Sequence, residues 1–168
     1  MAEFWDVYDK DKNKLNKISK RGDPLADDEF HLVINAWIKN KENKFLITQR
    51  VATKPHPLMW ECTGGSAVCG EDSLTAAIRE AKEETGIDLT GEQRIFVGSK
   101  NRYYKSLQDI LDVWLFEYTG SNENVKIQEE EVNDYMWATS EEIIELDKQG
   151  KFKKNPFFEE VVSGKINI

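Results

Sequence analysis

Cysteine, histidine and proline are scarce in this chain of 168 residues, and long hydrophobic runs are missing. The two cysteines, Cys62 and Cys69, cannot build a disulfide framework and lack the spacing of zinc ligands, so we expect buried free thiols. Because no run of about 18 apolar residues occurs, a membrane-spanning helix is not expected. The N-terminal sequence MAEFWDVYDK has no apolar signal segment, which favours a soluble, cytoplasmic protein.

Positive charge is also in short supply, because 23 Lys and Arg face 31 Asp and Glu and the formal net charge is −8. This excess of negative charge disfavours binding to nucleic acids and to anionic membranes. A small anionic molecule would have to be bound locally, by metal ions or by a few basic side chains. The hydrophobic content of 39% is typical of a globular protein, and the length predicts a single domain over residues 1–168.

Hydrophobic periodicity and turn residues divide the chain into a series of elements. An N-terminal β-hairpin is predicted from residues 4–8 and 15–19, and a second hairpin from residues 31–38 and 44–50. Residues 51–59 contain two prolines and predict a loop. Further strands are predicted at 94–99, 109–118 and 132–139, and helices at 73–85, from 140 to about 148, and from 155 to about 162.

The helix predicted at residues 73–85 has clear start and stop signals. Asp72 or Ser73 can accept a hydrogen bond from a free backbone N–H at its start. Apolar residues then recur at the spacing of a buried stripe, and Gly86 supplies the left-handed residue that ends the helix. The helix is therefore expected to pack one face on the core.

Three carboxylates occupy the C-terminal half of this helix, at Glu80, Glu83 and Glu84. Since an α-helix turns by about 100° per residue, all three point into one arc of roughly 100°. Carboxylates this close repel one another by about 0.2–0.5 kcal/mol for each pair in water, so something positive should offset the repulsion. The three glutamates could hold a shared cation.

Further residues stand around these glutamates at the spacing of a known signature. The full set is Gly65, Glu71, Arg79, Glu80, Glu83, Glu84 and Gly86. The pattern resembles the Nudix box, the signature of a hydrolase superfamily that cleaves nucleoside diphosphates linked to another moiety. The resemblance implies an α/β fold, the Nudix α/β/α sandwich with a mixed β-sheet, to which this chain adds its N-terminal β-hairpin. It also implies hydrolysis of a diphosphate bond with the help of Mg²⁺ or Mn²⁺.

The resemblance assigns roles to individual residues. The expected metal ligands are oxygen donors, which suit these hard cations: Glu80, Glu83, Glu84 and the backbone carbonyl of Gly64. Arg79 is expected to orient a glutamate by ion pairing, and Glu71 to brace the loop before the helix. Such enzymes often recruit a further glutamate from a later loop as ligand or base, for which Glu131 is the first candidate and Glu130 the second.

Candidates for substrate binding lie outside the signature, at Arg50, Tyr103 and Lys105. The segment Asn101–Lys105 could stack a base and meet phosphate, or it could be an ordinary surface loop. The predicted partner is a small-molecule diphosphate rather than a nucleic acid or a membrane. A homodimer is a reasonable expectation for an enzyme of this size.

The stretch HLVINAWIKNKENKFLITQRVATKPHPLMW is also similar to the corresponding part of isopentenyl-diphosphate isomerase, an enzyme with the Nudix fold. That likeness implies a protonating Cys in a Cys-Gly-His motif and a metal site built partly from histidines. Here the turn reads Thr63-Gly64-Gly65. His31 matches one metal histidine, but Pro24 replaces another, and a lone His at a strand start is more often structural. Hydrolysis is therefore predicted, with isomerisation and a non-catalytic ligand-binding module as alternatives.

Overall fold

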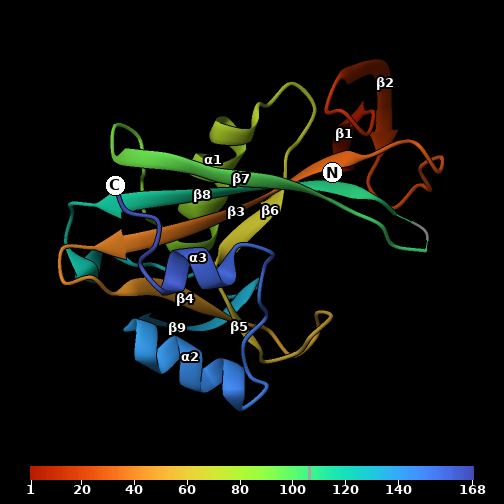
Figure 1. Ribbon diagram of the computed structural model, residues 1–168. Helices are drawn as coiled ribbons and strands as arrows, with labels where there is room; N and C mark the ends of the chain where they lie inside the picture. The colour runs from red at the N-terminus through yellow and green to blue at the C-terminus, as the bar shows by residue number, and fades with distance from the viewer. Residues whose placement is uncertain (106) are drawn as a thin grey trace.

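A computed structural model describes residues 1–105 and 107–168, and Figure 1 shows how the elements are arranged. The strands are β1 (Phe4–Tyr8), β2 (Lys14–Lys20), β3 (His31–Asn40), β4 (Phe45–Arg50), β5 (Trp60–Glu61), β6 (Thr63–Ser66), β7 (Gln93–Arg102), β8 (Asp109–Tyr118) and β9 (Val132–Ala138). The helices are α1 (Ser73–Thr85), α2 (Ser140–Lys148), α3 (Phe158–Val162) and a short 3-10 turn at Asn122–Asn124. Within the described ranges, no helix is long and apolar enough to cross a membrane.

A mixed sheet of seven strands is built around β3. On one side β3 pairs in parallel with β8 along its whole length, from His31 opposite Asp109 to Asn40 opposite Tyr118, and β8 pairs in turn with β7 in antiparallel fashion. On the other side β3 pairs in antiparallel fashion with β4 and β6. The mixed sheet expected from the sequence is thereby confirmed.

The hairpin predicted from β3 and β4 is forked. These two strands share a single register pair, Lys39 opposite Phe45, next to their turn. Beyond it, β6 pairs with the Val33–Ala36 part of β3, while β5 and β9 pair with β4. Because β6 satisfies the backbone groups that β4 leaves on β3, the strands can separate without losing hydrogen bonds. The fork holds β6 between them, so Gly64 and Gly65 lie in an extended strand paired with β3 rather than in the turn suggested by the sequence.

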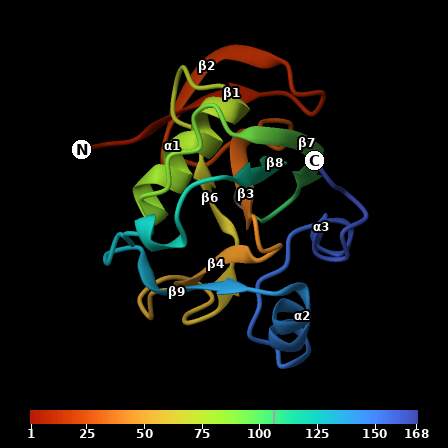
Figure 2. The same cartoon turned by 90° about the vertical axis from the view of Figure 1, so that its left-hand side faces the viewer.

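Helices cover both faces of this sheet, with α1 on one face and α2 and α3 on the other (Figure 2). Side chains of β3 alternate between the two faces, as the pleat of a strand requires. Ile34 and Ile38 pack in the core on the α1 side, and Val33 and Trp37 pack in the core that contains α2 and α3. The arrangement is the α/β/α sandwich that the sequence predicted.

The bounds of α1 agree with the prediction at both ends. The carboxylate of Asp72 accepts a hydrogen bond of 2.7 Å from the backbone N–H of Thr75, which is the N-cap contact. Gly86 adopts the left-handed conformation with φ of 74° and donates its N–H to the carbonyl of Lys82. The helix therefore ends at Thr85, directly after Glu84.

Other elements match the sequence with adjustments. The N-terminal β-hairpin is present as β1 and β2, and Tyr8 bridges to Phe30 before β3. β7 continues to Arg102, beyond the predicted end, because each added residue finds a partner on β8. α3 starts at Phe158 rather than at residue 155, since the side chain of Asn155 instead accepts a hydrogen bond from Phe157 N–H in a turn.

The cysteines are both free, but only one is buried as expected. Cys62 is 4% exposed and packs in the core on the α2 and α3 side. Cys69 is exposed, and its thiol lies 3.4 Å from the carboxylate of Asp6 on β1. The prediction of burial was wrong for Cys69 because it lies in the loop between β6 and α1, where the chain runs along the surface.

Candidate active site

A polar cavity of about 820 Å³ lies where the β3–β4 fork opens beside α1. Its lining includes most of the residues singled out in the sequence: Arg50, Gly64, Gly65, Arg79, Glu80, Glu83, Glu84 and Glu131. Glu71 stands behind the cavity and reaches it through its contacts with Arg79. The fold thus brings the glycines of β6, the glutamate-bearing helix and the later loop to one place.

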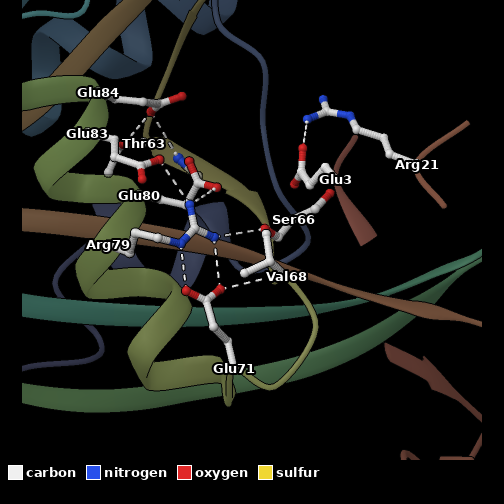
Figure 3. Close-up of polar contacts among 11 residues, drawn as sticks. Glu3, Arg21, Thr63, Ser66, Val68, Glu71, Arg79, Glu80, Glu83 and Glu84 are labelled. Atoms are coloured by element: carbon white, nitrogen blue, oxygen red, sulfur yellow. Dashed lines mark hydrogen bonds and ion pairs between the residues drawn. The ribbon is translucent and has the colours of Figure 1, made fainter. Parts of the chain in front are cut away.

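Arg79 is the centre of the polar contacts in this cavity (Figure 3). Its Nε and Nη2 donate to the two carboxylate oxygens of Glu71, at 2.6 and 2.9 Å. Its Nη1 donates to Glu80 at 2.9 Å and to Glu83 at 3.0 Å, and Nη2 also donates to the carbonyl of Ser66 at 3.1 Å. The neighbouring carboxylates raise the pKa of Arg79, so it stays charged. One guanidinium therefore offsets the repulsion among several glutamates.

Glu71 ties Arg79 to the loop between β6 and α1. The carboxylate that binds Arg79 on both oxygens also accepts a hydrogen bond of 3.0 Å from the backbone N–H of Val68. These are the contacts that a bracing residue needs, because they fix the loop and the arginine with the same group.

The two glycines of β6 are required by close approach rather than by an unusual φ. A side chain on Gly65 would place its Cβ 2.4 Å from the carboxylate of Glu80, and one on Gly64 would meet the carbonyl oxygen of Ile34 at 2.3 Å. With no side chains there, β6 lies directly against α1 and β3. This strand can therefore share a site with the glutamates.

Glu84 reaches from α1 to β6. Its carboxylate accepts a short hydrogen bond from the hydroxyl of Thr63 and one of 3.3 Å from the backbone N–H of Gly64. Loss of hydration raises the pKa of Glu84 to about 7, and the hydrogen bond from Thr63 opposes that rise. Burial likewise raises the pKa of Glu80, against the opposing effect of Arg79. Carboxylates with few water contacts gain from a bound cation.

The expected metal ligands suit a hard divalent cation, although their carboxylates accept hydrogen bonds from other groups of the protein. Among residues 1–105 and 107–168, no three Asp, Glu, His or Cys side chains converge closely enough to hold a metal ion. Glu80 and Glu83 instead bind Arg79, while Glu84 binds β6. All their oxygens are nevertheless carboxylate oxygens in one cavity, which is the chemistry that Mg²⁺ and Mn²⁺ prefer.

Glu131, the first candidate from a later loop, lies in the cavity and forms an ion pair with Lys54. Lys54 comes from the proline-containing loop after β4, and burial lowers its pKa. Glu130, the second candidate, is exposed and is not part of the cavity lining among the described residues.

Of the three candidates for substrate binding, the structure places Arg50 in the cavity and the other two outside its described lining. Arg50 lines the cavity at the end of β4 and donates to Glu61 at 2.6 Å. Tyr103 and Lys105 are exposed and lie outside its described lining, and Tyr103 packs edge-on against Phe30 with ring centres 5.4 Å apart. The ring of Tyr103 thus contacts Phe30 rather than the described lining of the cavity.

Several lining residues were missed in the sequence, above all Lys153 and Asn155 from the segment between α2 and α3. Local sequence could not reveal them, because two lysines before a proline turn look like ordinary surface residues. Their role depends on where the C-terminal segment returns to β5.

His31 lies apart from this site. It is 3% exposed, stacks on Trp5 with ring centres 4.0 Å apart, and its Nδ1 lies 3.1 Å from the carbonyl of Gln108. Burial lowers the pKa of this histidine, which favours the neutral ring. These contacts agree with a structural role for His31. The histidine that matches a metal ligand of the isomerase is therefore used here for packing and hydrogen bonding.

A mixed sheet between helices, with a glycine-containing strand and a glutamate-bearing helix tied together by one arginine, defines the class of α/β/α proteins with the Nudix architecture. The family model described as the NUDIX domain matches residues 29–161, and the chain belongs to this Nudix hydrolase family.

Comparison with individual proteins agrees with that membership. The chain is 34% identical to an uncharacterized Nudix hydrolase of Listeria monocytogenes over 154 residues, which cover 89% of this chain and 88% of the relative. It is 26% identical to the isopentenyl-diphosphate Delta-isomerase of Escherichia coli over 67% of this chain and 64% of that enzyme. The crystal structure of a Deinococcus radiodurans protein matches its fold with a TM-score of 0.75 and 20% identity, covering 98% of this chain and all of that one. Both branches suggested by the sequence, hydrolase and isomerase, are thus found among its relatives.

Proposed function

We propose that this protein is a Mg²⁺- or Mn²⁺-dependent pyrophosphohydrolase that cleaves a diphosphate bond in a nucleoside diphosphate or a nucleoside-diphosphate-linked small molecule. The observation that carries the proposal is the contact of Arg79 with Glu71, Glu80 and Glu83 beside the glycines of β6 in a polar cavity. These groups are not expected to converge on an ordinary surface helix.

The proposed metal ligands are Glu80, Glu83, Glu84 and the carbonyl of Gly64. A divalent cation held there would neutralise charge on phosphoryl oxygens and orient an attacking water. The residues around it prepare the site: Arg79 keeps two carboxylates aimed into the cavity, and the backbone at Gly64 lies close enough to Glu84 to hydrogen-bond to it.

Two further roles are proposed for cavity residues that lie outside α1. Glu131 would accept a proton from the attacking water once its ion pair with Lys54 opens. Arg50 presents a guanidinium to the cavity, and this group suits the oxygens of a phosphate. In this proposal Glu131 would take up the proton, and Arg50 would bind an anionic group of the substrate.

We test the proposal with purified protein on nucleotide sugars, ADP-ribose, dinucleoside polyphosphates and isopentenyl diphosphate, with Mg²⁺ or with EDTA. Chromatography of the products detects both hydrolysis and isomerisation. Hydrolysis that requires Mg²⁺ is expected, and Glu83→Gln should lower turnover by roughly two to three orders of magnitude. Glu141→Gln, an exposed carboxylate on α2, is the matched control and should not change it.

Isomerised isopentenyl product without release of phosphate would contradict the proposal, as would full activity of Glu83→Gln on a confirmed substrate. We further propose that the protein acts in the cytoplasm on a free small molecule rather than on nucleic acid, and as a homodimer. Light scattering during gel filtration measures the last of these.

A further inference from the structure

The chain returns to the cavity after α2. The backbone N–H of Trp60 on β5 donates to the carbonyl of Lys151 at 2.8 Å, and the N–H of Lys153 donates to the carbonyl of Trp60 at 2.8 Å. Between them, the ring of Phe152 stacks on Trp37 in the core on the α2 and α3 side. These contacts fix the segment as a short addition to β5, so the residues that follow are held at the cavity wall.

Glu61 on β5 is shared by two cations at this wall. Arg50 Nη1 lies 2.6 Å from one carboxylate oxygen, and Lys153 Nζ lies 3.2 Å from the other. The side chains of Arg50 and Glu61 are 15% and 18% exposed, and that of Lys153 is 38% exposed. Two positive charges against one negative charge leave this partly buried cluster with an excess of one positive charge.

Hydrogen-bond donors remain available on Arg50 and on Asn155, which lines the same cavity. Arg50 uses Nε for the carbonyl of Pro55 and Nη1 for Glu61, and in the described part of the chain Nη2 has no hydrogen-bond acceptor. The Nδ2 group of Asn155 has only the thiol of Cys62, at 3.5 Å, as its acceptor there. A thiol is a weak acceptor, so the amide can still donate to a ligand.

The described lining of the cavity contains charged, amide and small side chains and no aromatic ring. A ligand in this cavity is therefore recognised by charge and hydrogen bonds rather than by stacking. The cation cluster lies on the β4–β5 wall, on elements different from the α1 glutamates that the proposed metal would use. A substrate that fills both parts would carry anionic groups at both.

We propose that Arg50, Lys153 and Asn155 form a subsite for a second anionic group of the substrate, a phosphate or a carboxylate, separate from the diphosphate that is cleaved. Arg50 and Lys153 supply the charge, Asn155 supplies a neutral donor, and Glu61 orients both cations. The inference rests on the proposed function, because it assumes that the protein has a diphosphate substrate. Binding of an anion to the subsite can be tested without turnover.

The first experiment measures binding of inorganic phosphate in EDTA, where no divalent cation can hold it at the glutamates. Thermal shift and calorimetric titration compare wild type with Lys153→Met, Lys153→Arg and the control Lys148→Met, an exposed lysine on α2. Phosphate should stabilise the wild type, Lys153→Met should weaken binding at least tenfold, and Lys153→Arg should restore most of it. An equal response of wild type and Lys153→Met, or no binding by the wild type, overturns the proposal.

The second experiment uses substrate pairs that differ by one anionic group: UDP-glucuronate against UDP-glucose for a carboxylate, and NADPH against NADH for a phosphate. For at least one pair, kcat/KM of the wild type should favour the more anionic member about tenfold. Lys153→Met should bring that ratio close to one, whereas Lys148→Met should leave it unchanged. A ratio that Lys153→Met does not alter overturns the proposal. Phosphate binding through Lys153 by a protein that hydrolyses nothing would retain the subsite and reject the hydrolase.

Discussion

Replacing Arg79 by Met removes a guanidinium that contacts Glu71, Glu80 and Glu83 together. The arginine side chain is 25% exposed, and those of Glu71 and Glu80 are 14% exposed, so these pairs are only weakly screened by water. Hydrogen bonds to charged groups contribute about 1.5–3 kcal/mol each, and losing one partner of a buried pair costs about 3–5 kcal/mol. Since the cluster is not fully buried, we expect a loss of about 3 kcal/mol in the free energy of unfolding.

The assay is urea unfolding followed by tryptophan fluorescence, in EDTA at pH 7.5. For a chain of this length, such a loss corresponds to a fall of roughly 6–12 °C in Tm. Arg94→Met is the matched control, because Arg94 on β7 is exposed and donates only to the nearby carbonyl of Glu92. The control should stay within about 0.5 kcal/mol of wild type.

The pH dependence of this loss gives a second measurement. In the wild type, Arg79 lowers the pKa of Glu80 while burial raises it. Without the arginine, Glu80 takes up a proton at a higher pH in the folded state, and protonation removes the unpaired charge. The difference in stability between wild type and Arg79→Met should therefore shrink as the pH falls from 7.5 towards 5. Equal stability of Arg79→Met and Arg94→Met, or a difference independent of pH, would refute this reasoning.

Three further predictions concern single groups of the site and the thiols. Gly65→Ala should lower kcat at least tenfold with little change in far-UV circular dichroism, because its Cβ would meet the carboxylate of Glu80 at 2.4 Å. The pKa of Glu84 is raised from 4.5 to about 7, so the metal-free protein loses stability as the pH rises from 4.5 through 7. The stability gained by Glu84→Gln should grow over that range to roughly 3 kcal/mol, by chemical unfolding. Ellman's reagent should react with the exposed Cys69 in the folded protein, and with Cys62 only after unfolding, because the core excludes the reagent from Cys62.

Local signals were sufficient for much of the fold. The bounds of α1 follow from Asp72 and Gly86, whose capping contacts involve only nearby residues. The β3–β4 fork was not predicted, because the Gly64–Gly65 segment contains too few β-forming side chains to be recognised as a strand. That segment becomes β6 through its pairing with β3, which no local pattern expresses.

The candidate site divides in a similar way. Spacing on one helix was enough to place Glu80, Glu83 and Glu84 on a common side, since helical geometry is regular. It could not show that Arg79 would bind several carboxylates, or that Lys153 would reach the cavity. Those contacts depend on the side-chain conformations and on the path of a segment distant in sequence.

The full-length parallel pairing of β3 with β8 also has a consequence for synthesis of the chain. β3 leaves the ribosome long before residues 109–118 exist, and its neighbour on that side cannot be supplied by any earlier segment. α1 packs on a surface to which β3, β6 and β8 all contribute, so the helix emerges before its docking surface is complete. Because contacts between distant segments form slowly, the part of this surface that β8 supplies is added only after β3, β6 and α1 have been made. The polar cavity beside α1 is therefore completed late in folding, because Glu131, Lys153 and Asn155 in its lining come from the C-terminal part of the chain.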